Sequence, residues 1–85
     1  ISKQVAKSLE HLPPKHFKQI LGKIMKLLED PYPQDFKKIK VEEKEYSRVD
    51  SGEYRIIYRA TDSLLTLVLI DKRNDDSVYK ALKRK

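Results

Sequence analysis

Apolar positions in the first third of the chain recur every three or four residues, which is the period of an amphipathic helix. Between residues 2 and 12 these positions are Val5, Ala6, Leu9 and Leu12. Ser2 can cap the first turn, because its hydroxyl can accept a hydrogen bond from an unpaired backbone N–H. The pattern therefore predicts a first helix over residues 2–12.

Two prolines, Pro13 and Pro14, separate this segment from a second helical pattern. Proline cannot donate to a continuing helix, yet it suits the first turn of a new one. The second helix is predicted over roughly residues 14–29. Its apolar stripe consists of Phe17, Ile20, Leu21, Ile24, Leu27 and Leu28. Two one-faced helices with a short connection predict an antiparallel helical hairpin.

The helical period ends at DPYPQD, residues 30–35, because the residue before a proline avoids helical geometry. Phe36 and Ile39 are expected to anchor the next segment, and EEKE, residues 42–45, is interpreted as a solvated connection. Three strands are then predicted, over about residues 45–50, 53–60 and 63–70. Turns at Ser51-Gly52 and Thr61-Asp62-Ser63 make these strands a meander.

The expected fold class is α+β, with the helical hairpin packed on one face of a small antiparallel β-sheet. LLTLVLI, residues 64–70, is apolar on both faces, which favours the central strand. A short C-terminal helix is expected in SVYKALKRK, residues 77–85. Alternation along residues 53–60 puts Arg55, Ile57 and Arg59 on one face and Tyr54, Ile56 and Tyr58 on the other. We expect the arginines on the face that the helices leave uncovered.

Composition narrows the classes of partner and chemistry. The 85 residues suggest one domain with a thin core, and 19 Lys and Arg against 13 Asp and Glu give a net charge of +6. This balance favours nucleic acid or an acidic protein segment, although charge also keeps small domains in solution. The chain has no cysteine, no apolar run of transmembrane length and no signal-peptide pattern, so we expect a cytoplasmic protein. It opens at Ile1 rather than methionine, and part of a first strand is expected to be missing there.

Most common catalytic patterns are missing from the sequence. His11 and His16 have no partner histidine or acidic motif, and the two glycines, Gly22 and Gly52, form no phosphate loop, so no metal or cofactor is expected. The remaining candidates on or just after strands are Arg48, Arg55, Arg59 and Arg73, with Tyr79 six residues further on. Arginine binds phosphate bidentately, and tyrosine stacks on bases. The alternative is a set of scattered surface arginines.

Three segments resemble the RelE/ParE superfamily of bacterial and archaeal toxins: DPYPQDFKKIK, EYSRVDSGEYRIIYR and LVLIDKRNDDSVYKAL. GEYRIIYR and the K-R-x(4)-V-Y ending are the most specific parts. The resemblance covers nearly the whole chain and implies a single toxin domain over residues 1–85. The family fold starts with a strand before its first helix, which agrees with the missing strand expected above. The resemblance favours a RelE-like toxin of a type II toxin–antitoxin system.

RelE-like members cleave messenger RNA in the ribosomal decoding site, so the resemblance implies a metal-independent endoribonuclease. The ribose 2′-OH would attack its own 3′-phosphate, leaving a 2′,3′-cyclic phosphate and a 5′-OH. By resemblance, Arg55 and Arg73 contact the reacting phosphate and Tyr79 orients the target nucleotide, while Arg48 stands where a lysine is common. The expected RNA-binding residues are Lys37, Lys38, Lys40, Lys44, Arg59 and Lys72.

The general base stays open at this point. Arginine, with a pKa above about 12, is a poor base near neutral pH, so Arg48 is expected only to hold phosphate. The candidates are Lys37, Lys38, Lys40, Lys44, Asp35 and Tyr79. Some relatives use a carboxylate near this part of the chain, which makes Asp35 a possible general base.

Two other functions remain open by resemblance. ParE-like members inhibit DNA gyrase without cleaving RNA, and an inactive relative would only bind an antitoxin. The expected partners are the ribosome, messenger RNA and a cognate RelB-like antitoxin. No association with a membrane is expected. The antitoxin would lay an acidic, flexible segment over the basic face and the helices, which neutralises charge and covers apolar surface.

Overall fold

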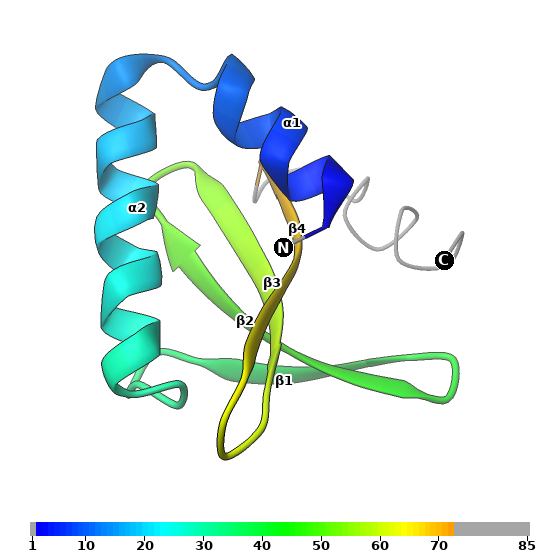
Figure 1. Cartoon of the computed structure of the whole chain (residues 1–85). Helices are drawn as coiled ribbons and strands as arrows, with labels where there is room; N and C mark the ends of the chain where they lie inside the picture. The colour runs from blue at the N-terminus through cyan, green and yellow to red at the C-terminus, as the bar shows by residue number, and fades with distance from the viewer. Residues whose placement is uncertain (1, 73–85) are drawn as a thin grey trace.

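The computed structural model describes residues 2–72 as two helices and an antiparallel sheet (Figure 1). Ile1 and residues 73–85 lie outside the described residues, and the expected C-terminal helix falls in the latter range. The α+β class predicted from the sequence is confirmed.

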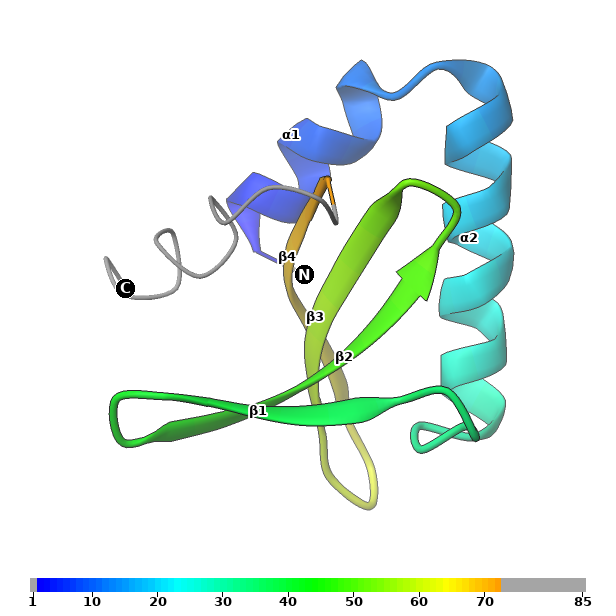
Figure 2. The same cartoon turned by 180° about the vertical axis from the view of Figure 1, so that it is seen from behind.

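Both helices form where the apolar period predicts them, as α1 (Lys3–His11) and α2 (Pro14–Glu29). The Ser2 hydroxyl accepts a hydrogen bond from the Val5 N–H at 3.1 Å, which confirms the cap. Pro14 occupies the first turn of α2. The chain reverses at the two prolines, and the helices diverge from that junction (Figures 1 and 2).

The four strands are β1 (Lys37–Val41), β2 (Lys44–Ser51), β3 (Tyr54–Ala60) and β4 (Leu65–Lys72). They pair in chain order, β1-β2-β3-β4, and each pair is antiparallel. The predicted meander of three strands is therefore confirmed as β2, β3 and β4. Figures 1 and 2 show that the sheet is strongly twisted, so that β1 crosses the direction of β4.

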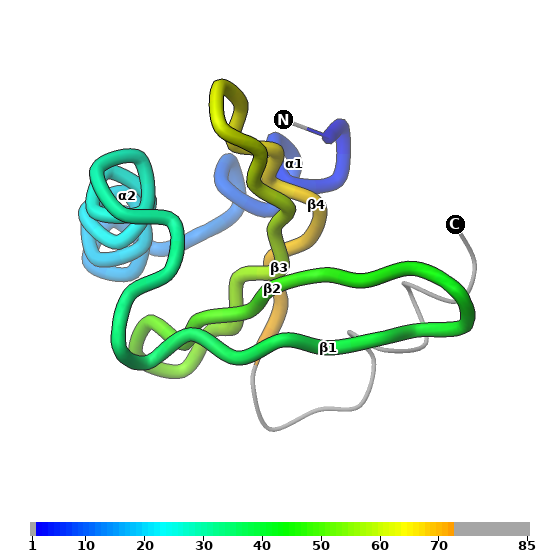
Figure 3. The backbone as a smooth tube through the Cα atoms, turned by 90° about the horizontal axis from the view of Figure 1, so that it is seen from below, coloured from blue at the N-terminus to red at the C-terminus, as the bar shows by residue number. Residues whose placement is uncertain are grey.

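Strand β1 was not predicted from the sequence, and the interpretation of all of residues 42–45 as a connection was wrong. Only Glu42 and Glu43 form the turn, and Glu42 takes the left-handed φ of 57°. Lys44 and Glu45 belong to β2. The alternating pattern of β1 is hard to recognise in the sequence, because three of its five residues are lysines. Only Ile39 and Val41, which face the apolar cluster on the side of the sheet away from the helices, are apolar. Figure 3 shows the β1–β2 hairpin reaching out on the side away from α2.

The prediction that residues 64–70 form the central strand was also wrong, because β4 is an edge strand of the described sheet. Its apolar character on both faces has another cause. Leu67 and Ile70 pack under the helices, whereas Val68 and Leu69 belong to an apolar cluster on the opposite face. Helix α1 runs along this edge, and the hydroxyl of Ser2 donates to the Val68 carbonyl at 3.0 Å. Such bonds satisfy carbonyls that an edge strand would otherwise leave to water.

Two apolar clusters lie on opposite faces of the sheet. The helix-side cluster joins both helices to β2, β3 and β4; its buried members are Val5, Ile20, Ile24, Leu27, Val49, Ile56, Tyr58, Leu67 and Ile70. The far-side cluster contains Val41, Tyr46, Ile57, Val68 and Leu69, all buried, with Ile39 at its margin. Ile56 and Tyr58 therefore face the helices as predicted. The face that carries the arginines also has an apolar centre of its own.

Candidate functional site

The far face of the sheet, opposite the helices, carries most of the predicted cationic residues. Lys37 on β1 lies directly across from Arg48 on β2, and Arg48 lies across from Ile57 on β3. Because side chains alternate along a strand, Lys44, Arg55 and Arg59 project on this same face. The tertiary structure thus gathers five cations from three strands around the far-side cluster.

Arg55 is a largely enclosed cation, and it is held by a carboxylate. Its Nε donates to Asp50 Oδ1 at 3.1 Å, and its side chain is only 14% exposed. The register also places Asp71 of β4 directly opposite Arg55. Sequence reasoning missed both acidic residues, although the alternation of β2 could have placed Asp50 on the arginine face. Any phosphate that binds Arg55 therefore competes with a carboxylate already in place.

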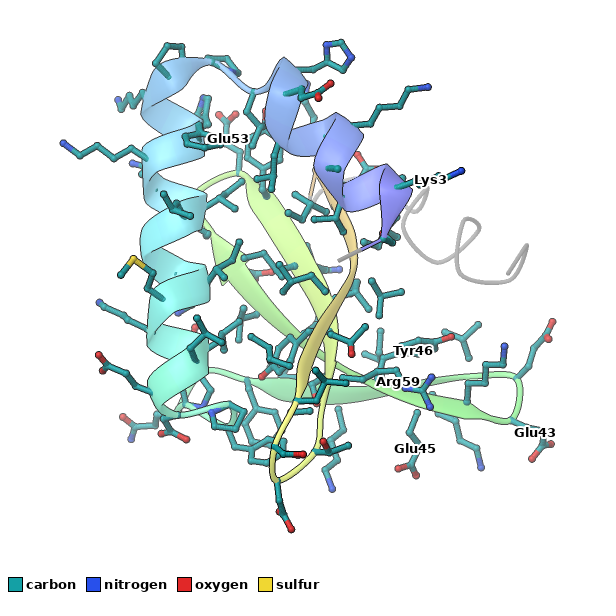
Figure 4. All side chains as sticks on the ribbon, viewed as in Figure 1. Lys3, Glu43, Glu45, Tyr46, Glu53 and Arg59 are labelled. Carbon is teal, nitrogen blue, oxygen red and sulfur yellow. The ribbon has the colours of Figure 1, made fainter. Side chains whose placement is uncertain are left out.

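Arg59 has a different environment on the same strand. Its guanidinium carbon lies 5.6 Å from the centre of the Tyr46 ring, which is buried in the far-side cluster. Figure 4 shows these two side chains together on one side of the β1–β2 hairpin, while Glu45 points to the other side. Stacking leaves the edge of a guanidinium able to donate hydrogen bonds to an anion. Arg59 can therefore stack on Tyr46 and still bind an anion.

Asp35, the possible general base, is paired with a lysine of α2. Lys23 Nζ lies 2.7 Å from Asp35 Oδ2, and this hydrogen bond lowers the pKa of the Asp35 carboxyl. A lower pKa makes the carboxylate a weaker base, so its pairing disfavours Asp35 in that role. Asp35 does lie near Lys37 and Arg48, because all three line a small cavity of about 40 Å³.

The other three predicted RNA-binding lysines do not share the far face. Lys38 lies opposite Ser47, Lys40 opposite Glu45 and Lys72 opposite Tyr54, and alternation turns these positions toward the helix side of the sheet. Lysines that are close together in the segment FKKIKV therefore lie on opposite faces of the sheet. Lys37 joins the far-face cations, and Lys38 and Lys40 do not.

A cavity of about 300 Å³ opens beside the base of the β1–β2 hairpin. Lys38, Tyr46 and Arg59 line it together with Tyr32, which the sequence analysis did not select. Tyr32 is half exposed, packs on Phe36 and donates to the Ala60 carbonyl at 3.4 Å. This aromatic wall lies next to the far-face cations.

Other predicted residues fall elsewhere. Arg73 and Tyr79 lie outside the described residues. His16 packs against the ring of Tyr54 at 5.3 Å between ring centres, and His11 ends α1. Within residues 2–72 no three histidine, aspartate or glutamate side chains gather in a cluster suited to a metal ion.

No family model, curated protein or solved structure matches this chain. In the part of the chain that the structure describes, neither helix has the length and apolar character needed to cross a bilayer.

The ion pair between Asp50 and Arg55 gives a first testable result. We expect Asp50→Ala to lower the free energy of unfolding by about 1 kcal/mol, because Arg55 is largely enclosed; the 38% exposure of Asp50 keeps the loss below that of a fully buried pair. Urea unfolding followed by circular dichroism measures the change. Asp62→Ala removes the same charge from an exposed turn and should cost less than about 0.5 kcal/mol. Equal losses in the two variants would contradict the role given to Asp50.

Proposed function

We propose that this chain is a RelE-like toxin of a type II toxin–antitoxin system, which cleaves messenger RNA on the ribosome. The observation that carries the proposal is the far face, where Lys37 and Arg48 stand side by side with Arg55 and Arg59 nearby. A net charge of +6 adds to it, since cations that converge on one face attract and orient a phosphate backbone.

We assign the roles below from the resemblance in the sequence, and the placement of the far-face cations supports them. Lys37, Arg48 and Arg59 would hold the RNA backbone, while Arg55 and Arg73 would contact the phosphate that the 2′-OH attacks. Tyr79 would orient the nucleotide. Among the candidates for the base, Lys37 and Lys44 lie on the far face with the arginines, and Lys37 lies directly across from Arg48. The RelE/ParE fold, the cytoplasmic location and an acidic RelB-like antitoxin belong to the same proposal.

A ParE-like inhibitor of DNA gyrase is the second candidate, and the state of Arg55 favours it. A guanidinium that is 14% exposed and bound to Asp50 is less available to a phosphate than a free one. A protein that only binds gyrase or an antitoxin has no need of a free arginine there.

Primer extension on messenger RNA incubated with programmed ribosomes and the full chain tests the proposal. We expect cuts in the decoding site that appear only when ribosomes are present, because the toxin would use the ribosome to position its substrate. Free messenger RNA is the parallel control. The proposal would be wrong if the RNA stayed intact in both reactions. If gyrase–DNA cleavage complexes also accumulated in cells that express the protein, the gyrase inhibitor would be the correct function.

Two lysines of β1 supply a matched pair of variants for the same assay. Lys37→Ala removes a far-face cation, and we expect cleavage to fall at least tenfold. Lys40→Ala removes the same charge from the opposite side of β1, where Lys40 lies across from Glu45, and should stay within about threefold of the parent. Arg48→Ala should resemble Lys37→Ala. If Lys40→Ala were the more damaging change, the far face would not be the RNA-binding face.

A further inference from the structure

Helix α2 has an exposed line of apolar residues, the exposed stripe, beside the apolar side that it turns to the sheet. Figure 1 shows α2 along one side of the molecule, with the sheet on its inner side only. The exposed stripe consists of Phe17, Leu21, Met25 and Leu28, which are between 39% and 66% exposed. Their spacing of four, four and three residues keeps them along one line of the helix. Single exposed leucines are ordinary, but a line of four large apolar side chains marks an interaction surface.

The two ends of the exposed stripe differ in shape. At the N-terminal end lies the partly exposed aromatic ring of Phe17, near the start of α2. At the other end, a cavity of about 290 Å³ lies between the end of α2 and the turn that joins β3 to β4. Leu28 and Leu64 line this cavity, and both are more than half exposed. One end therefore offers a bulky ring, and the other end offers a hollow.

The two ends also differ in charge, with a lysine at one and two carboxylates at the other. Lys18 lies seven residues before Met25 and Glu29 lies four residues after it, so both border the exposed stripe on the same side of the helix. Glu29 also lines the cavity, together with Asp62. Lys26 lies about 100° further round the helix than Met25, away from this border. Within residues 2–72, neither Lys18 nor the two carboxylates form an ion pair, so the exposed stripe has a basic end and an acidic end.

The order of these features along α2 fits a second copy of the same helix that runs in the opposite direction. Lys18 and Glu29 are eleven residues apart, about three turns, and their midpoint lies close to the middle of the exposed stripe. A two-fold axis through that midpoint, perpendicular to the helix, would bring Lys18 of each copy beside Glu29 of the other. The same axis would bring Phe17 of each copy to the cavity of the other. Parallel helices would instead bring like charges together.

We propose that this chain forms a symmetric dimer in which the exposed stripes of two α2 helices pack antiparallel. Apolar anchors at intervals of three and four residues are the pattern by which two helices interlock. A two-fold interface uses the same patch on both copies, so the patch must be complementary to itself in shape and charge. The exposed stripe meets both conditions, whereas a uniformly acidic or basic partner would meet a like charge at one end. Antiparallel packing also brings together helix ends of opposite dipole sign.

The dimer does not depend on the proposed nuclease activity. The exposed stripe lies on the helix side of the sheet, and the far-face cations lie on the other side. Dimerisation would leave the far face open, so loss of the dimer and loss of cleavage can be measured separately. An antitoxin segment that covered α2 would have to displace the second copy.

Sedimentation equilibrium of the full chain, from about 1 μM to about 1 mM, measures the dimer. We expect the mean mass to rise from that of one chain toward that of two. Leu21→Lys should raise the dissociation constant at least about tenfold, because it places a charge in both halves of the apolar contact. Gln19→Lys adds the same charge at an exposed position on another side of α2 and should change the constant less than about twofold. Both positions are exposed, so each variant should fold, which circular dichroism can verify.

Reversal of the two border charges tests the antiparallel arrangement. Lys18→Glu and Glu29→Lys should each weaken the dimer about tenfold, because each change turns two attractions into two repulsions. The double variant restores opposite charges across the two-fold axis, so its dissociation constant should return to within about threefold of the parent. The two positions are roughly 16 Å apart along one helix, so this rescue cannot arise from a pair within one chain.

A spin label reports the orientation of the two helices directly. The chain has no cysteine, so Lys15→Cys provides a single site for the label. The labelled protein is mixed with a ¹⁵N-labelled parent chain that carries no spin label. Broadening of the amide signals should centre on Leu28 and Leu64, at the cavity end of the ¹⁵N-labelled copy.

Several results would contradict the proposal. They are a chain that stays monomeric over the whole concentration range, equal effects of Leu21→Lys and Gln19→Lys, and a double charge reversal that does not restore the dimer. Broadening centred on residues 15–18 of the ¹⁵N-labelled copy would show a parallel pair instead. Broadening centred on the far face would assign dimerisation to the far-side cluster.

Discussion

Replacing Ile57 by alanine is expected to lower the free energy of unfolding by about 3 kcal/mol. Ile57 has no exposed surface, and it packs in the far-side cluster with Tyr46, Val68 and Leu69. Truncation removes buried carbon atoms and leaves a cavity that the surrounding sheet cannot close. A chain of this length has a total stability of roughly 4–13 kcal/mol, so the loss is a large share of it.

Urea unfolding at neutral pH measures this effect, and two further variants calibrate it. Ile57→Val should lose about 1 kcal/mol, because it removes one methyl group. Ile39→Ala, at the half-buried margin of the same cluster, should lose less than Ile57→Ala. A loss below about 1 kcal/mol for Ile57→Ala would mean that the arginine-bearing face is simply solvated, and that the far-side cluster is not part of the core.

The second large effect concerns Tyr58 at alkaline pH. Tyr58 is fully buried, and its hydroxyl donates to the Pro31 carbonyl, which ties the loop after α2 to the sheet. Burial raises the pKa of Tyr58 from 10 to about 12, with nearby Tyr32, Asp35 and Asp30 adding to the shift. Between these two values the unfolded chain releases the Tyr58 proton and the folded chain keeps it. Stability is therefore fully present below pH 10 and falls as the pH rises toward 12, by about 2–3 kcal/mol.

Comparison with Tyr58→Phe isolates this residue, because the lysines and the other tyrosines titrate in both proteins. At pH 8 the variant should be about 1–2 kcal/mol less stable, since the Pro31 carbonyl loses its donor. Between pH 9 and 12 the stability of the parent should fall more steeply, so the difference closes or reverses. Parallel stability curves over that range would show that Tyr58 ionises as easily in the folded protein as in the unfolded chain.

In the candidate site, the alternation of side chains along a strand predicts which face a residue lies on but not which residues it contacts. Alternation correctly put Arg55 and Arg59 on the face away from the helices. It did not indicate that Asp50 would hold Arg55, or that Tyr46 would lie against Arg59. Both contacts join different strands, and they depend on a register that no single segment specifies.

The lysines of β1 illustrate the same point from the other direction. As a run of sequence, Lys37, Lys38 and Lys40 form one basic cluster. Once Lys37–Val41 pairs with β2, the two-residue period of a strand sends Lys37 to the far face and the other two away from it. Because β1 was not predicted from the sequence, the three lysines could not be assigned to different faces of the sheet.

Both helices, their cap and boundary, the meander of β2 to β4 and the net positive charge can be predicted from the sequence. These features depend on periods, prolines and turn residues, whose physical effects extend over a few neighbouring positions. Three features are visible only once the chain is folded: β4 is an edge strand, the arginine face has an apolar centre, and α2 leaves a stripe exposed. In the apolar stripe of α2, the sequence alone could not separate Leu27 from Leu28. Leu27 is buried and Leu28 is exposed, because the sheet lies against only one side of the helix.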